Sequence, residues 1–213
     1  MLFDTLVEHH VYHGVQRPVT ARAYDYLLAG NGLFKRAHSR HIHACMPLAV
    51  TRVAGLPDLE PEFSLWPGRV PGRLLYPILA DARRHNGREW MYQICLSPEG
   101  TRWRVTMPAQ HSNAARVEYQ AGADGVICDL HSHHRMPAFF SEDADDCDET
   151  GFRFYAVIGR VLDRPEISVR LGMYGDFWYL PAPALFSHFG PPGGDCGPFV
   201  DRYGDANGNH PDD

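Results

Sequence analysis

The sequence VICDLHSHH occupies residues 126–134, and SEDADDCDE follows it at residues 141–149. The apolar residues 126–128 predict a short buried strand that leads into the histidines. Side chains two residues apart on a strand share a face, so His131 and His133 would present two imidazoles to one ion. Ser141 followed by acids is typical of the start of a helix, whose first turn would supply a carboxylate. Two histidines and one aspartate form a ligand set for catalytic zinc, with the fourth position open to water.

The spacing of these residues resembles a known metalloprotease motif. His131, Ser132 and His133, then seven residues, Ser141 and a nearby Asp are similar to the JAMM motif of JAB/MPN-domain metalloproteases, which include isopeptidases. The sequence from DLHSHHRMPAFFS through DETGFRFYAVIGR resembles the prokaryotic JAB branch. More narrowly, it resembles JAB members of the PRTRC cassette, which is named for its ParB-related and ThiF-related proteins. The resemblance covers about residues 70–182 and implies one bound Zn²⁺.

Two positions depart from the JAMM pattern. The pattern usually has Pro after the second His, where this chain has His134, and its Asp falls where this chain has Ala144. If the strand continued, His134 would point to its opposite face, so Pro should replace it with little loss of metal. Asp143 and Asp145 flank Ala144, and counting back from residues 151–153 favours Asp145 as the third ligand. Asp143 is the alternative.

The resemblance also implies the remaining catalytic groups. JAMM enzymes use a glutamate on an early strand as general base and then general acid, and Glu89 heads a predicted strand at the matching place. Glu99, in a turn, and Glu118, close to the histidine strand, are weaker candidates. Ser141, besides capping a helix, would donate a hydrogen bond to the oxyanion of the tetrahedral intermediate.

Composition limits the fold and the classes of function. A chain of 213 residues with 44% hydrophobic content can bury one good core and a small accessory domain. The net charge of −6 argues against a general nucleic-acid binder. No apolar run approaches the ~20 residues of a membrane span, and no signal peptide is apparent. Five cysteines without a C-x-x-C pair favour reduced thiols in the cytoplasm.

The fold class expected from the resemblance is α/β: a JAB/MPN, cytidine deaminase-like mixed sheet flanked by helices, with a small N-terminal accessory region. The predicted divisions are an accessory region at 1–70, the JAB/MPN-like domain at 71–185 and a flexible Gly/Pro/Asp-rich tail at 186–213. Periodicity and turn residues predict helices at 20–28 and 74–84 and strands at 45–53, 89–96, 103–108, 154–161, 167–174 and 177–180. The last two strands would be joined across Gly175-Asp176.

Other interpretations compete with the zinc peptidase. His41 and His43 form a second His-x-His, but no acid or serine follows at useful spacing, and Cys196 and His210 are too isolated to be ligands. Barrel hydrolases that open with Asp-x-His-x-His need far more chain after the motif, and nucleoside deaminases need a Pro-Cys-x-x-Cys pair that is absent. A JAB-fold scaffold without hydrolysis is the main rival.

The resemblance implies a protein substrate. We expect cleavage of a peptide or isopeptide bond at the C-terminus of a ubiquitin-like or ThiF-linked small protein. A ThiF-like activating enzyme of the same cassette is a candidate partner, and we expect no direct contact with nucleic acid or membrane.

Overall fold

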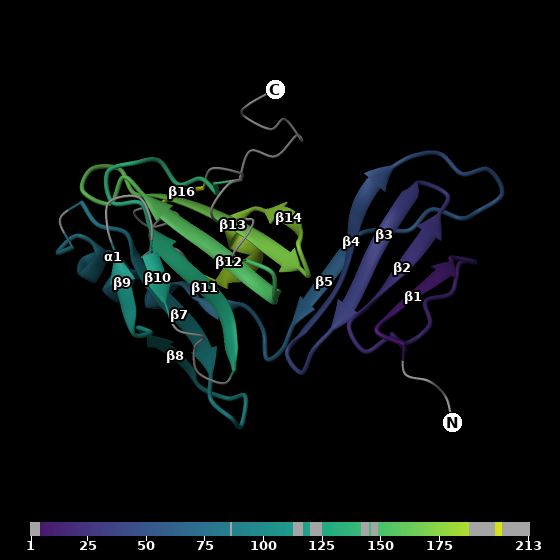
Figure 1. The fold of residues 1–213 in the computed structure, drawn as a ribbon, viewed down its shortest axis with the longest axis horizontal. Coiled ribbons are helices and arrows are strands. Elements are labelled where there is room, and N and C mark those ends of the chain that lie inside the picture. Colours follow the sequence, from purple (N-terminus) through teal and green to yellow (C-terminus); the bar gives the residue numbers. More distant parts are fainter. Residues whose placement is uncertain are drawn as a thin grey trace. The chain divides into compact units, whose positions relative to one another are not determined.

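A computed structural model of the chain describes residues 5–85, 87–112, 117–119, 125–141, 145, 149–187 and 199–201. The chain divides into two compact units, Met1–Gly68 and Arg69–Asp213 (Figure 1). None of the helices in the described ranges is both long and apolar enough to cross a membrane.

The first unit is a five-stranded sheet in the order β1-β2-β3-β4-β5 (Figure 1). β1 and β2 are parallel and the other pairs are antiparallel. A small apolar cluster that includes Leu27, Phe34 and Leu59 forms its core. The strands are β1 Val7–Val11, β2 Tyr24–Ala29, β3 Gly32–His38, β4 Ile42–Val50 and β5 Glu62–Leu65.

The prediction of a helix at residues 20–28 is wrong, because most of this segment is strand β2. Burial alternates along β2, as on a strand with one covered face. Asp25 on its buried face pairs with Arg36, the residue directly opposite on β3, at 2.7 Å. This buried cross-strand ion pair is a long-range contact that local helix propensity does not reflect.

The second unit is built on a mixed sheet in the order β14-β13-β12-β11-β7-β8 (Figure 1). Within that order only the β11–β12 pair, at the centre, is parallel. Two short two-stranded pairs, β9–β10 and β6–β15, complete the unit. Its elements are β6 Val70–Pro71, η1 Gly72–Leu74, α1 Leu75–Ala82, β7 Trp90–Leu96, β8 Trp103–Thr106, β9 Gln110–Ser112, β10 Val117–Tyr119, β11 Val126–Ser132, β12 Phe152–Gly159, β13 Glu166–Met173, β14 Asp176–Leu180, α3 Ala182–Leu185, β15 Phe186–Ser187 and β16 Val200–Asp201.

The strands predicted for the second unit and the helix at 74–84 are confirmed to within a few residues. Helix α1 is held to the sheet by its buried apolar face and by the Tyr92 hydroxyl, which donates to Asp81 at 2.9 Å. One turn differs: β13 and β14 are joined at Tyr174-Gly175, one residue earlier than predicted. Both turn residues have positive φ, as a two-residue type I′ hairpin requires.

Part of the predicted tail is ordered against the second unit. β16 pairs with the start of β13, and Phe199 beside it is buried. The Asp201 carboxylate accepts the backbone N–H of Ala182 at 2.8 Å, at the start of α3. Composition predicted a mobile tail, but residues 199–201 pack against the second unit. One buried apolar side chain and one hydrogen bond at the start of a helix hold them there.

Candidate metal centre

Strand β11 carries the first histidine of the motif at the centre of the sheet. It lies between β12 and β7, with His131 opposite Val157 on one side and Met91 on the other. The His131 side chain is 4% exposed. A buried strand with neighbours on both sides has little freedom, so this imidazole is held in place before any ligand binds.

The second histidine lies just beyond the end of β11, in a loop fixed by backbone hydrogen bonds. The His133 N–H donates to the carbonyl of Ile158 at 2.8 Å, and the Met136 N–H donates to the His133 carbonyl at 2.8 Å. Nδ1 of the His133 ring is 3.1 Å from the carbonyl oxygen of Pro137. A carbonyl only accepts, so Nδ1 carries the hydrogen and Nε2 keeps a free lone pair, as in histidine ligands whose second nitrogen is held by the protein.

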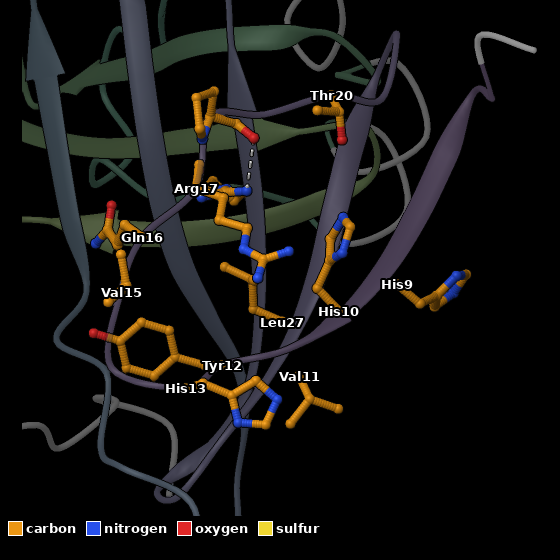
Figure 2. Close-up of a pocket in the computed structure, with 12 residues that line it drawn as sticks. His9, His10, Val11, Tyr12, His13, Val15, Gln16, Arg17, Thr20 and Leu27 are labelled. Atoms are coloured by element: carbon orange, nitrogen blue, oxygen red, sulfur yellow. Dashed lines mark hydrogen bonds between the residues drawn. The ribbon is translucent and has the colours of Figure 1, made fainter. Parts of the chain in front are cut away.

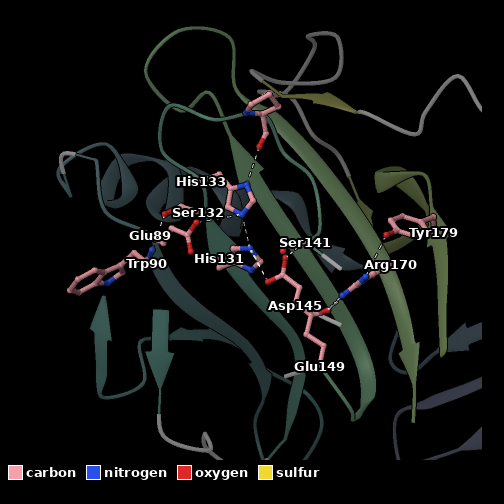
Figure 3. A network of polar contacts seen from close by, with 11 residues as sticks. Glu89, Trp90, His131, Ser132, His133, Ser141, Asp145, Glu149, Arg170 and Tyr179 are labelled. Carbon is pink, nitrogen blue, oxygen red and sulfur yellow. Dashed lines mark hydrogen bonds and ion pairs between the residues drawn. The ribbon is translucent and has the colours of Figure 1, made fainter. Parts of the chain in front are cut away.

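Three side chains converge on one point (Figure 3). Nε2 of His131 is 3.1 Å from Nε2 of His133 and 3.7 Å from Oδ1 of Asp145. A tetrahedral zinc site with Zn–N near 2.1 Å places neighbouring donor atoms about 3.4 Å apart. The donor types and their separations therefore fit zinc, and they are the three ligands predicted from the motif.

Asp145 is held at the start of a helical turn. Its N–H donates to the Ser141 carbonyl at 2.9 Å, and its Oδ2 accepts the Ser141 N–H at 2.6 Å. This reciprocal pair places Ser141 at the N-cap, as predicted, and leaves Oδ1 directed at the histidines. The alternative ligand, Asp143, lies outside the described residues.

Glu89 lies directly before β7 and faces the same point (Figure 3). Its Oε1 is 3.7 Å from Nε2 of His133, and the residue is 7% exposed. Burial and the nearby Asp145 carboxylate raise the pKa of Glu89 to about 7. A carboxyl with this pKa exchanges protons near neutral pH, which suits a general base. The start of β7 is fixed by the Trp90 N–H, which donates to Ser132 Oγ at 3.2 Å.

Burial sets the charge of the histidines. It lowers the pKa of His131 well below its usual value, and the neighbouring His133 and Arg170 lower it further. Burial also lowers the pKa of His133, against the hydrogen bond to Pro137 and the Asp145 charge. Both rings are therefore neutral at physiological pH, which is the state that binds a metal ion.

A buried ion pair that the sequence analysis did not find lies beside the centre. Arg170 on β13 is fully buried and donates from Nε and Nη2 to Oε2 of Glu149, at 3.0 and 2.7 Å (Figure 3). Its guanidinium stacks on the rings of Phe140 and Phe177, 4.0 and 3.6 Å from their centroids. The Glu149 N–H donates to the Asp145 carbonyl at 2.8 Å, so the pair anchors the metal-facing turn to the sheet.

The Asp of the Asp-x-His-x-His sequence is not part of the candidate centre. Asp129 accepts hydrogen bonds from Gln93 at 2.9 Å and from Arg153 at 3.0 Å, one to each carboxylate oxygen. Both oxygens are thus occupied by the sheet, which argues against the barrel-type site that would use this residue as a ligand.

The expectation for His134 is wrong. Strand β11 ends at Ser132, and His134 has φ of 39°. Proline is confined to φ near −65°, so Pro would be strained at this position. The His134 carbonyl also accepts the Val161 N–H at 2.8 Å, which ties the loop to the end of β12.

The N-terminal unit contains a second group of metal-type donors that the sequence analysis missed: Glu8, His10 and Asp25. Only the pairing of β1 with β2 brings Asp25 to the other two, and no local pattern indicates that pairing. Glu8 already accepts hydrogen bonds from two threonine hydroxyls, and Asp25 is paired with Arg36. These carboxylates are satisfied without a metal.

Among the described residues, the donor group of the centre includes none of the other predicted candidates. Within the described residues, His41 and His43 join no group of three metal-type donors, and the His41 ring stacks on Trp66. Glu99 is in the turn between β7 and β8. The side chains of Glu118, Cys196 and His210 lie outside the described residues.

Comparison with known proteins identifies the region that contains this centre. Residues 72–172 match the sequence model of the family described as prokaryotic homologs of the JAB domain. This range contains every residue of the candidate centre. A comparison with curated proteins gives no match. The narrower likeness to the PRTRC cassette stays a prediction.

Proposed function

We propose that the chain is a zinc-dependent peptidase or isopeptidase of the JAMM type, because residues 72–172 match the sequence model of the JAB domain family. The observation that carries this proposal is the convergence of His131, His133 and Asp145, with Glu89 beside them. The two neutral imidazoles and the carboxylate would hold Zn²⁺. A zinc ion bound by three protein groups supplies an acidified water and a Lewis acid for the carbonyl under attack.

Glu89 would move the proton in this reaction. As a carboxylate it would accept a proton from the attacking water at Oε1, and as a carboxylic acid it would deliver that proton to the leaving amine. A pKa of about 7 allows both steps near neutral pH. The hydrogen bond from His133 Nδ1 to Pro137 would keep the imidazole oriented throughout. The oxyanion role of Ser141 remains part of this proposal.

The substrate class is proposed from the resemblance to JAMM metalloproteases and not from the geometry. We propose a peptide or isopeptide bond at the C-terminus of a ubiquitin-like or ThiF-linked small protein, with a ThiF-like activating enzyme as a candidate partner.

The direct test combines zinc content with cleavage. We expect one zinc per chain by emission spectrometry, and loss of that zinc in His131→Ala and Asp145→Asn but not in Asp143→Asn. Zinc lost from Asp143→Asn and retained by Asp145→Asn would mean that the third ligand is Asp143. Fusions of ubiquitin-like proteins to a reporter should be cleaved by the parent chain only. Full zinc without cleavage of any fusion would favour a binding scaffold.

A further inference from the structure

A cavity of about 630 Å³ lies in the N-terminal unit, and none of its lining residues belongs to the metal centre (Figure 2). It is lined by part of β1, by the segment that follows it and by residues of β2 and β3. The lining contains three histidines and two arginines but no acidic residue. Ligand sites in proteins are typically of this size, with a few polar groups set among apolar ones.

Arg36 forms the buried cationic part of the lining. It is 2% exposed; its Nη2 donates to Asp25 at 2.7 Å and its Nη1 donates to the Arg17 carbonyl. Its buried Nε–H has no hydrogen-bond partner among the residues that the structure describes. This atom is enclosed by protein, and the guanidinium is held in place by Asp25 and by the Arg17 carbonyl.

Arg17 provides a second guanidinium at the cavity (Figure 2). Its side chain is exposed and makes no ion pair or hydrogen bond with any residue in the described part of the chain. Only its backbone carbonyl is engaged, by Arg36. The planar, multi-donor geometry of guanidinium matches carboxylate and phosphate oxygens.

The acids nearest to the cavity are already engaged. Asp25 is paired with Arg36, and Glu8 accepts hydrogen bonds from Thr5 and Thr20 and lies 3.2 Å from His10. Hydrogen bonds from hydroxyl groups leave the charge of Glu8 in place, so the attraction for an anion comes from Arg17. The lining also includes the apolar residues Val11, Val15 and Leu27.

We propose that this cavity binds a small organic anion, with a carboxylate or phosphate group at Arg17 and an apolar body against Val11, Val15 and Leu27. Arg17 holds the oxyanion, and Arg36, His10 and His13 line the same cavity as additional polar groups. The site is independent of the proposed hydrolysis, since none of its residues belongs to the metal centre.

Isothermal titration of the full-length, zinc-loaded chain with phenyl phosphate and with phenylacetate tests this assignment. We expect at least one probe to bind, and Arg17→Gln to weaken it roughly tenfold or more, because a charge-assisted hydrogen bond is lost. Arg17→Gln keeps the carbonyl that holds Arg36, so its thermal midpoint should match the parent. Arg40→Gln, an exposed arginine of the same unit that does not line the cavity, is the matched control and should bind like the parent.

His131→Ala separates this site from the metal centre, which could itself attract an oxyanion. Binding retained in His131→Ala and weakened in Arg17→Gln supports the cavity site. The tighter probe then distinguishes a phosphate from a carboxylate ligand. No binding of either probe at millimolar concentration, equal binding by Arg17→Gln and the parent, or loss of binding in His131→Ala would overturn the proposal.

Discussion

Glu89 is the residue on which the proposed chemistry depends most directly. Glu89→Gln keeps the shape of the side chain but cannot accept a proton, so turnover should fall by about 10²–10⁴-fold. Zinc content should stay at the parent level, because Glu89 is proposed to act beside the ligands. In the parent, kcat/KM should rise with pH as Glu89 ionises. Simultaneous loss of zinc would mean that Glu89 is itself a ligand.

The same residue should weaken the metal-free fold at high pH. The pKa of Glu89 is raised from 4.5 to about 7, so its favourable contribution is complete below pH 4.5 and is lost as the pH rises through 7. In chelator-treated protein, we therefore compare the free energy of unfolding of Glu89→Gln with that of the parent. The difference in favour of the variant should increase from pH 4 to pH 8 by on the order of 3 kcal/mol. Urea unfolding at both values measures this difference. Glu60→Gln changes an exposed glutamate and is the control. Its free energy of unfolding should differ from that of the parent by the same amount at both pH values. An increase as large as that of Glu89→Gln would contradict the assignment to Glu89.

At the scale of single residues, the sequence named side chains that the structure brings together. His131 and His133 were predicted from their spacing, and Asp145 and Glu89 from the resemblance to the JAMM family; the four lie around one point. The backbone of His134 could not be predicted, because its positive φ follows from the loop that closes onto Val161. Arg170 gave no local signal, since its partner Glu149 is distant in sequence and meets it only through the sheet.

Among the structural elements, the turn that bears Asp145 depends on the Arg170–Glu149 pair. Removing both charges with Arg170→Met/Glu149→Gln avoids leaving one buried charge unpaired, so the variant should fold. Asp145 would then be less firmly held, and zinc affinity in a chelator competition should fall roughly 10–100-fold, as for other groups that orient metal ligands. Arg52→Met/Asp58→Asn removes an exposed pair of the other unit and is the matched control. Unchanged zinc affinity in the buried-pair variant would show that the pair does not support the site.

The errors in the predicted elements have a common physical origin. Strand β2 was predicted as a helix because its local pattern fits both structures, and the ion pair between Asp25 and Arg36 that selects the strand joins two separate segments. The short strand β16 was missed because two residues carry no periodicity. By contrast, α1 and β7 were predicted well, since their apolar periodicity extends over seven or eight residues.

At the scale of the whole molecule, the chain separates into a unit that contains the candidate metal centre and a unit that contains the candidate anion site. The extent of the resemblance predicted an accessory region at 1–70, and the chain divides into two compact units after Gly68. The all-strand architecture of the first unit and its cavity could not be predicted, because both arise from pairing between strands. The family match supports a function for the second unit only, since it spans residues 72–172.

This division leads to a prediction about the isolated second unit. Each contact described above for His131, His133, Asp145 and Glu89 is made by a residue after Gly68, and the unit has its own buried core within the mixed sheet. A fragment of residues 69–213 should therefore fold cooperatively and bind one zinc with the affinity of the full chain, measured by circular dichroism and chelator competition. The same fragment with His131→Ala is the control and should fold without zinc. A fragment that folds but binds zinc at least tenfold more weakly would mean that the N-terminal unit supports the metal centre as well as its own cavity.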